Sequence, residues 1–277
     1  MSSKRKTAGK VAINVGLVIV LVVHITPLLT MALNSVRSNA DVAKQLIGIP
    51  TQLSWSNYVD AWTSGNYARA FLNTVIINCV AIVVVLFADV TAAYGLTKLN
   101  IFGKEFFNAY FVMGVSVPSF AIIVPLYFFF DKIGLVNNRI GMIIIYSAIF
   151  MPFTLLFMRS FYLGIPRSLE EAALIDGCSE AGALRRVTLP LAMPMVTTAA
   201  LVVFVNSYNE FLFANVFLQQ KDLRTVALSF YSFVGQYSSD LGTVFAAGCI
   251  TLLPIMILYL FLQRRFIEGF AEGAVKG

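Results

Sequence analysis

A chain of 277 residues that is 58% hydrophobic and only 12% charged is too apolar for an ordinary soluble domain, since such domains are about half apolar and about a quarter charged. Its mean hydropathy of +0.81 indicates a membrane protein. The net charge of +6 needs no nucleic-acid partner, because basic residues beside membrane spans on the cytoplasmic side give the same balance. We therefore expect membrane lipid, and no nucleic acid, around this chain.

Six apolar runs are long enough to cross a bilayer as helices. They are residues 11–33, 71–94, 106–130, 140–161, 193–217 and 242–262. The first run is longer than the core of a signal peptide, and we expect it to be retained. The sequence thus predicts an all-α polytopic membrane protein with a basic N-terminus over residues 1–10, a six-helix transmembrane domain over residues 11–263 and a tail over residues 264–277.

The distribution of lysine and arginine predicts the orientation of this domain, because cytoplasmic loops carry an excess of both. Seven of the 20 basic residues lie on the side opposite the N-terminus. These seven are Arg37, Lys44, Arg69, Lys132, Arg139, Lys221 and Arg224. The remaining thirteen lie on the N-terminal side. We therefore expect a protein of the plasma membrane with both termini in the cytoplasm.

The longest polar break between apolar runs is residues 166–190, PRSLEEAALIDGCSEAGALRRVTLP. Ser168 has the capping-box spacing to Glu171, and Gly177 is suited to end the helix that would follow. Ser179 is placed to cap a second short helix. The first helix has a small, weakly apolar face, which suits shallow docking in a groove. That face comprises Leu169, Ala172, Ala173 and Asp176. Spacing alone leaves a docking surface and a solvated loop equally open.

Two acids fall within the predicted spans, where an ionisable group is costly and therefore a functional candidate. Asp89 is close to the cytoplasmic end of its span, and we expect it to reach interfacial water or a basic neighbour. Glu210 follows Asn206, Ser207, Tyr208 and Asn209 in the fifth span. Such a polar cluster serves either as hydrogen bonds between helices or as the lining of a transport pathway. The pathway candidates are Asn206, Tyr208, Asn209 and Glu210.

Motifs for catalysis and cofactor binding are missing from the sequence. No stretch matches the phosphate-binding pattern G-x-x-x-x-G-K-[ST], so we do not expect this chain to hydrolyse nucleotide or to be an enzyme. The three cysteines and the single histidine lack the spacing of a metal site. We therefore expect neither a cofactor nor a metal on this chain.

The polar break also contains a sequence pattern that is more specific than its helix caps and its apolar face. Glu171-Ala172-Ala173, three residues, Gly177, nine residues and then Val187 to Pro190 resembles the EAA loop of bacterial ABC-importer permeases. Further segments look like the shorter six-span permease of the maltose-type carbohydrate importers. They are residues 92–96, 134–138, 158–161, 208–211 and 269–277.

This resemblance implies a function and a set of partners. The chain would be a permease subunit that imports a sugar by alternating access, paired with a second permease chain, two ATPase subunits that bind ATP and Mg²⁺, and an extracytoplasmic sugar-binding protein. The coupling loop would span residues 163–192 and dock on the ATPase. The implied docking residues are Glu170, Glu171, Ala172, Ala173, Asp176, Gly177, Leu189 and Pro190. Three alternatives stay open, namely an ABC permease for another solute, an ion-coupled secondary transporter that uses Asp89 and Glu210, and a scaffold without transport.

Overall fold

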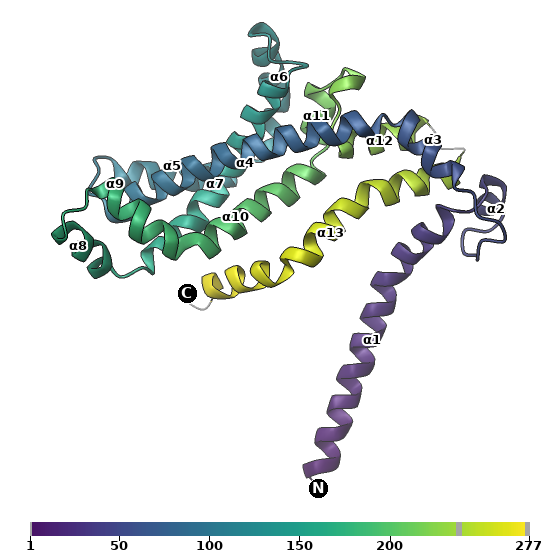
Figure 1. Cartoon of the computed structure of the whole chain (residues 1–277), viewed down its shortest axis with the longest axis horizontal. Coiled ribbons are helices and arrows are strands. Elements are labelled where there is room, and N and C mark those ends of the chain that lie inside the picture. Colours follow the sequence, from purple (N-terminus) through teal and green to yellow (C-terminus); the bar gives the residue numbers. More distant parts are fainter. Residues whose placement is uncertain (1, 237–239, 275–277) are drawn as a thin grey trace. The chain divides into compact units, whose positions relative to one another are not determined.

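The computed structural model describes residues 2–236 and 240–274, and every regular element in these ranges is a helix (Figure 1). Five helical segments are long and apolar enough to cross a membrane, and a bent pair of helices makes a sixth if it forms one span. The five lie within α1 (Ser2–Asn34), α4 (Tyr67–Lys98), α7 (Arg139–Leu163), the helix that ends as α10 (Leu189–Asn209), and α13 (Leu241–Ala274). The all-α polytopic class is confirmed. Of the predicted tail, residues 275–277 lie outside the described residues.

The third predicted span is not one helix. α5 (Lys104–Ser116) is followed by the short η1 (Ser119–Ile122) and α6 (Ile123–Lys132), and the two halves of this pair are bent by 90°. Val117 at the break is extended, with φ −76° and ψ 122°. The following Pro118 explains this conformation, because proline disfavours the helical region for the residue before it and cannot donate a backbone hydrogen bond.

The fifth predicted span begins and ends at the wrong residues. α9 (Glu180–Ala183), a π-helical segment (Leu184–Thr188) and α10 form one continuous span from Glu180 to Asn209. The chain then becomes extended at Glu210, with ψ 122°, before the separate helix α11 (Leu212–Phe217). The apolar run 193–217 therefore covers parts of two helices. Hydropathy averaged over a window does not detect that the backbone of a single residue, Glu210, interrupts the helix.

The chain divides into two compact units. One comprises residues 1–67 and 230–254, with α1, the short helices α2 (Asn39–Lys44) and α3 (Ser56–Ser64), most of α12 (Val226–Gln236) and the first part of α13. Inside this unit the buried Asn57 amide donates to the carbonyl oxygens of Ser35 and Arg37 at 3.0 and 2.9 Å. These bonds fix the connection that follows α1.

The other unit comprises residues 68–229 and 255–277, and its core lies where α4, α7 and α10 meet. There Ala93 of α4, Met158 of α7 and Met195 of α10 share one buried cluster. A second cluster joins α4 and α7 to α6 and α11, with Tyr146 and Phe217 among its largest members. The helix α8 (Arg167–Ile175) and the η3 turn (Lys221–Leu223) lie in the connections.

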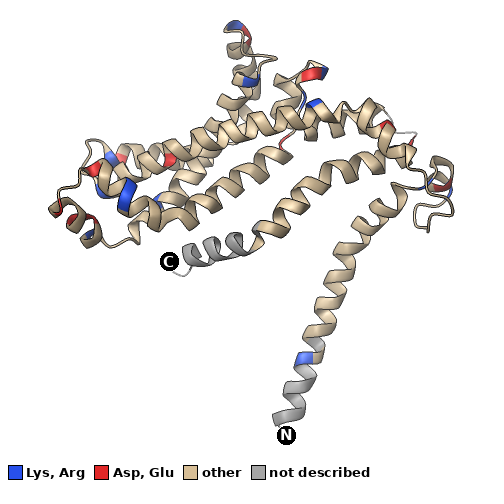
Figure 2. Ribbon diagram, viewed as in Figure 1, with Lys and Arg blue, Asp and Glu red and all other residues tan. Residues whose placement is uncertain are grey.

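Apolar side chains remain exposed along the spans. Of the apolar window within α1, 0% is buried, and in the other four helical spans the buried share is 39% or less. Such an apolar surface needs lipid or another membrane chain to cover it. Figure 2 shows that charged residues gather around α8 and α9, whereas the described parts of α1 and α13 contain almost none. This distribution distinguishes the apolar spans from the polar connection, by which we mean residues 166–190 with α8 and α9.

Candidate functional site

The polar connection contains two short helices, as the sequence predicts, but the first begins differently. α8 runs from Arg167 to Ile175, its N-cap is Pro166, and no side chain caps it. The proposed Ser168 cap is therefore wrong, because Ser168 already lies in the first turn. Pro166 has a φ of −59°, which its ring fixes near the helical value, so the helix can begin directly after it.

The end of α8 is the one the sequence predicts. Gly177 has a φ of +86°, a conformation that glycine adopts without a steric penalty. The Cys178 N–H donates to the Ala173 carbonyl oxygen at 2.9 Å and the Gly177 N–H donates to that of Leu174 at 3.0 Å. This pair of bonds is the Schellman ending. Ser179 then caps α9, its hydroxyl oxygen accepting from the Gly182 N–H at 3.2 Å, so both predictions are confirmed.

α8 has a buried face and an exposed face. Glu170 and Ala173 are buried, at 6% and 8% exposure. Glu171, Ala172 and Asp176 are exposed, together with Ile175, whose exposure is 86%. The expectation that Ala173 shares the outward face is thus wrong, and Glu170 faces the body of its own chain. Any groove that receives this helix would meet an isoleucine flanked by acids.

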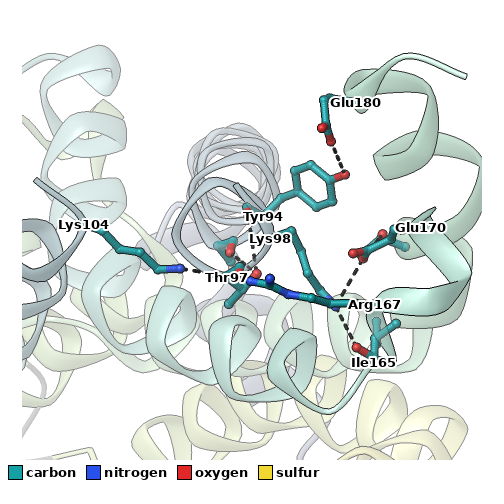
Figure 3. A network of polar contacts seen from close by, with 10 residues as sticks. Tyr94, Thr97, Lys98, Lys104, Ile165, Arg167, Glu170 and Glu180 are labelled. Atoms are coloured by element: carbon teal, nitrogen blue, oxygen red, sulfur yellow. Dashed lines mark hydrogen bonds and ion pairs between the residues drawn. The ribbon is translucent and has the colours of Figure 1, made fainter. Parts of the chain in front are cut away.

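Figure 3 shows what holds the buried face of α8. The Glu170 carboxylate lies 3.3 Å from the Lys98 ammonium, at the last residue of α4. It also accepts a hydrogen bond of 2.8 Å from the Thr188 hydroxyl, in the π segment that leads into α10. The Lys98 ammonium in addition donates to the Ile165 carbonyl oxygen at 2.7 Å. α8 is therefore attached at one carboxylate to both neighbouring spans.

Leu189 and Pro190 lie at the start of α10, where Leu189 is half-buried and Pro190 is exposed. Pro190 has no N–H to donate within the helix. Directly before it the helix widens into the π segment, and the Leu189 N–H donates to the Leu184 carbonyl oxygen. Of the predicted docking residues, Glu171, Ala172 and Asp176 are exposed on α8, whereas Glu170 and Ala173 are buried. Gly177 lies in the turn that follows α8, and Leu189 and Pro190 lie at the beginning of α10.

The pathway candidates lie at the other end of α10. Asn206 and Asn209 are exposed, and their amide groups donate to carbonyl oxygens one turn earlier, at 2.7 and 2.8 Å. Tyr208 is buried on the other side of the helix. Next to Asn206, α7 and α10 line a half-open cavity of about 440 Å³. It is lined by Ile149, Phe150, Phe153, Thr154, Val202, Val205 and Asn206.

Glu210 caps a helix and does not lie in the middle of a span. One oxygen of its carboxylate accepts from the Phe213 N–H at 2.8 Å, and the other accepts from the Ala214 N–H at 3.2 Å and from the Tyr146 hydroxyl at 3.0 Å. These contacts satisfy the first N–H groups of α11. The geometry gives Glu210 a structural role in joining α10, α11 and α7.

The comparison with known families gives the site a context. The family model described as "Binding-protein-dependent transport system inner membrane component" matches residues 85–270, which include α8, the π segment and α10. The chain belongs to this family. It is therefore a multi-pass inner-membrane permease component, and not itself a catalytic subunit.

Two relatives of this permease component are similar over nearly their whole length. The diacetylchitobiose uptake system permease protein NgcG of Streptomyces coelicolor is 32% identical, over 92% of this chain and 85% of that protein. The arabinooligosaccharides transport system permease protein AraQ of Halalkalibacterium halodurans is 31% identical, over 99% and 100%. A crystal structure of a bacterial ABC transporter involved in import of alginate contains a chain with a TM-score of 0.82, 24% identity, and coverage of 96% and 99%. This likeness shows that the fold is shared.

Asp89 of the permease is buried inside the protein, whereas from the sequence we expect it at the membrane interface. Its exposure is 0%, and neither carboxylate oxygen has a hydrogen-bond partner among the described residues. It reaches neither interfacial water nor a basic neighbour, so that expectation is wrong. The neighbouring Thr154 hydroxyl donates to the Phe150 carbonyl oxygen at 2.9 Å. Hydropathy places Asp89 along a span but gives no indication of the face it occupies.

Sequence reasoning also missed Lys98, Thr188 and Ile175. Lys98 and Thr188 approach Glu170 from separations of 72 and 18 residues (170 − 98 and 188 − 170), which no local pattern reveals. Ile175 carried a usable signal, because it lies four residues after Glu171 and therefore on the same face of the helix. Among the described residues, no group of three or more His, Cys, Asp and Glu could hold a metal ion.

Proposed function

We propose that this permease component imports a sugar by alternating access, driven by ATPase subunits that dock on α8. The complete importer would contain a second permease chain, two ATPase subunits and an extracytoplasmic sugar-binding protein, with both termini of this chain in the cytoplasm. The observation that carries the proposal is a short helix with one exposed face, attached on its other face to two spans. The family membership, together with the substrates after which the two relatives are named, supports a sugar as the transported solute.

The exposed face of α8 would receive the motion of the ATPase. Ile175 supplies an apolar contact, and Glu171 one turn before it and Asp176 directly after it supply charges that suit a basic rim. The Gly177 turn and the Ser179 cap keep α8 at a fixed angle to α9. A push on Ile175 would therefore displace the whole connection and would not simply unwind its end.

α10 would carry this displacement to the cavity. It has 21 residues, which at a rise of about 1.5 Å per residue span roughly 30 Å. Thr188 at its beginning is bonded to Glu170, and Asn206 near its end lines the cavity. A tilt imposed at the α8 end would thus move Asn206 and Asn209 relative to α7.

The cavity has the chemistry that a sugar needs. Phe150 and Phe153 offer aromatic surface, and the Asn206 amide offers a hydrogen-bonding group at its edge. A largely apolar pocket with a few polar groups is typical of small-molecule sites. Because the cavity lies on one permease chain, the proposed partner chain would complete it.

The test is sugar-stimulated ATP hydrolysis by the reconstituted complex of both permease chains, the ATPase and the binding protein. We expect loss of stimulation for Ile175→Asp and Glu171→Gln, with normal amounts of permease in the membrane. Glu105→Gln is the matched control, because Glu105 is an exposed acid in the first turn of α5. If ATP hydrolysis is stimulated by a solute that is not a sugar, and no sugar stimulates it, the sugar assignment is rejected. Normal stimulation in the Ile175→Asp variant would reject docking on α8.

A further inference from the structure

The attachment of α8 to α4 is a buried ion pair. The side chains of Lys98 and Glu170 are 4% and 8% exposed, and their charged atoms are 3.3 Å apart. Both charges have additional partners, since Lys98 donates to the Ile165 carbonyl oxygen at 2.7 Å and Glu170 accepts from Thr188 at 2.8 Å. A buried charge is tolerated only when it is paired and hydrogen-bonded in this way.

Burial makes this attachment stiff. If α8 moved while α4 stayed in place, Glu170 and Lys98 would separate inside the protein, and each would be left as an unpaired buried charge. Breaking a buried pair is far less favourable than breaking an exposed one, which water compensates. The ion pair therefore favours movements in which α8 and the end of α4 stay together.

Weaker contacts around the ion pair also hold α8 and α9 against the end of α4 (Figure 3). The Tyr94 hydroxyl of α4 donates to the Glu180 carboxylate of α9 at 3.2 Å. The Arg167 guanidinium of α8 donates to the Thr97 carbonyl oxygen of α4 at 3.3 Å. The last turn of α4 is thus held by both short helices of the polar connection, and Lys98 is the charged residue of that turn.

We propose that Lys98 is a positioning residue for energy coupling, which fixes α8 to α4 so that a displacement of α8 moves α4 together with α10. This inference rests on the proposed function, because it assumes that a partner displaces α8. It adds a residue outside the EAA-like loop to the coupling machinery, and it assigns α4 as a second receiver of the motion. The exposed Glu171 would bind the partner, whereas the buried Glu170 would transmit the displacement of α8 to α4.

A double variant separates a coupling role from a purely structural one. Lys98→Met combined with Glu170→Met removes both charges at once, so no unpaired charge stays buried, and such replacements are often tolerated. We expect this permease to assemble and to retain basal ATP hydrolysis, while sugar stimulation falls on the order of 10-fold, within the range of coupling between sites. Lys98→Arg, which keeps the charge, should retain most of the stimulation. Wild-type stimulation in the double variant would overturn the proposal.

The matched control is the ion pair near the other end of α4. Arg69 and Asp222 are 3.4 Å apart, but their side chains are 60% and 65% exposed. Arg69→Met combined with Asp222→Met removes the same two kinds of charge from the surface. We expect wild-type stimulation, and a loss equal to that of the buried pair would show that charge removal from this chain is harmful wherever it occurs and would reject a specific role for Lys98.

A distance measurement decides the inference even if sugar import itself is not observed. Spin labels at Ser168→Cys on α8 and Phe87→Cys on α4 would report their separation in the assembled complex, with the native cysteines replaced by serine; both positions are exposed, and Ser168 is not one of the docking residues. We expect one narrow distance distribution, unchanged by ATP, and a broad distribution in the double methionine variant. A wild-type distance that changes with ATP, or an equally narrow distribution in the variant, would refute the proposal. Failure of ATP-driven sugar uptake with these distances intact would instead refute the proposed function.

Discussion

The turn at Gly177 gives a prediction whose magnitude follows from the structure. Gly177 has a φ of +86°, and no atom lies within 4 Å of the position a Cβ would occupy. Replacement by alanine is therefore penalised only by backbone conformation, at about 1–2 kcal/mol. That shifts the equilibrium between the formed and the opened turn by a factor of roughly 5–30. Asparagine visits this conformation more readily, so Gly177→Asn should have a smaller effect.

Proline at this position should have a larger effect than alanine for two reasons. Its ring fixes φ near −65°, far from +86°, and it removes the N–H that donates to the Leu174 carbonyl oxygen. We therefore expect uptake by the complete importer to decrease in the order Gly177→Asn, Gly177→Ala, Gly177→Pro, with near-complete loss in the last.

The assay is uptake of labelled sugar by cells, normalised to the amount of permease in the membrane. Gly235→Ala is the matched control, because Gly235 also has open space around its Cβ position but lies within the helix α12 without a positive φ. That change should leave uptake unchanged. Normal uptake by Gly177→Pro, or a loss in Gly235→Ala as large as in Gly177→Ala, would refute the reasoning.

Three further variants test other parts of the site. Glu210→Ala removes the acceptors of the Phe213 and Ala214 N–H groups, so the thermal midpoint in detergent should fall by an amount equivalent to about 1 kcal/mol; an unchanged midpoint would contradict the capping role. Asn206→Ala alters an exposed cavity residue, so the KM for sugar should rise while the midpoint stays constant; a lowered midpoint with normal KM would contradict this. Asp89→Leu replaces a buried carboxyl whose oxygens have no hydrogen-bond partner among the described residues, so the midpoint should stay constant or rise; a fall of several degrees would mean that a neighbour such as Thr154 stabilises the carboxyl.

The elements that the sequence predicts well are those determined by local chemistry. Four of the six spans, those in α1, α4, α7 and α13, follow from hydropathy. The end of α8 follows from Gly177, because the helix needs a residue that tolerates a positive φ there. The start of α9 follows from the hydroxyl of Ser179. Each of these depends on a few neighbouring residues, and each is present in the structure.

The elements that the sequence predicts poorly depend on single breaks or on distant partners. Proline alone does not distinguish a kink from a 90° turn, so the sequence does not predict the size of the bend at Val117 and Pro118. The extended Glu210 ends α10 inside a continuous apolar run. Glu170 reads as one of several surface acids until Lys98, from another helix, is placed beside it. In each case the deciding contact comes from tertiary packing, which overrides the local pattern.

The central claim is that this chain moves sugar with energy received from ATP through α8. The most direct measurement is the uptake of labelled oligosaccharide into proteoliposomes that contain the complete complex, with ATP supplied on the ATPase side, compared with a proton gradient and no ATP. We predict uptake that requires ATP and the binding protein, ignores the proton gradient and is lost in Ile175→Asp. Uptake that follows the proton gradient without ATP, or that persists in Ile175→Asp, would contradict the account.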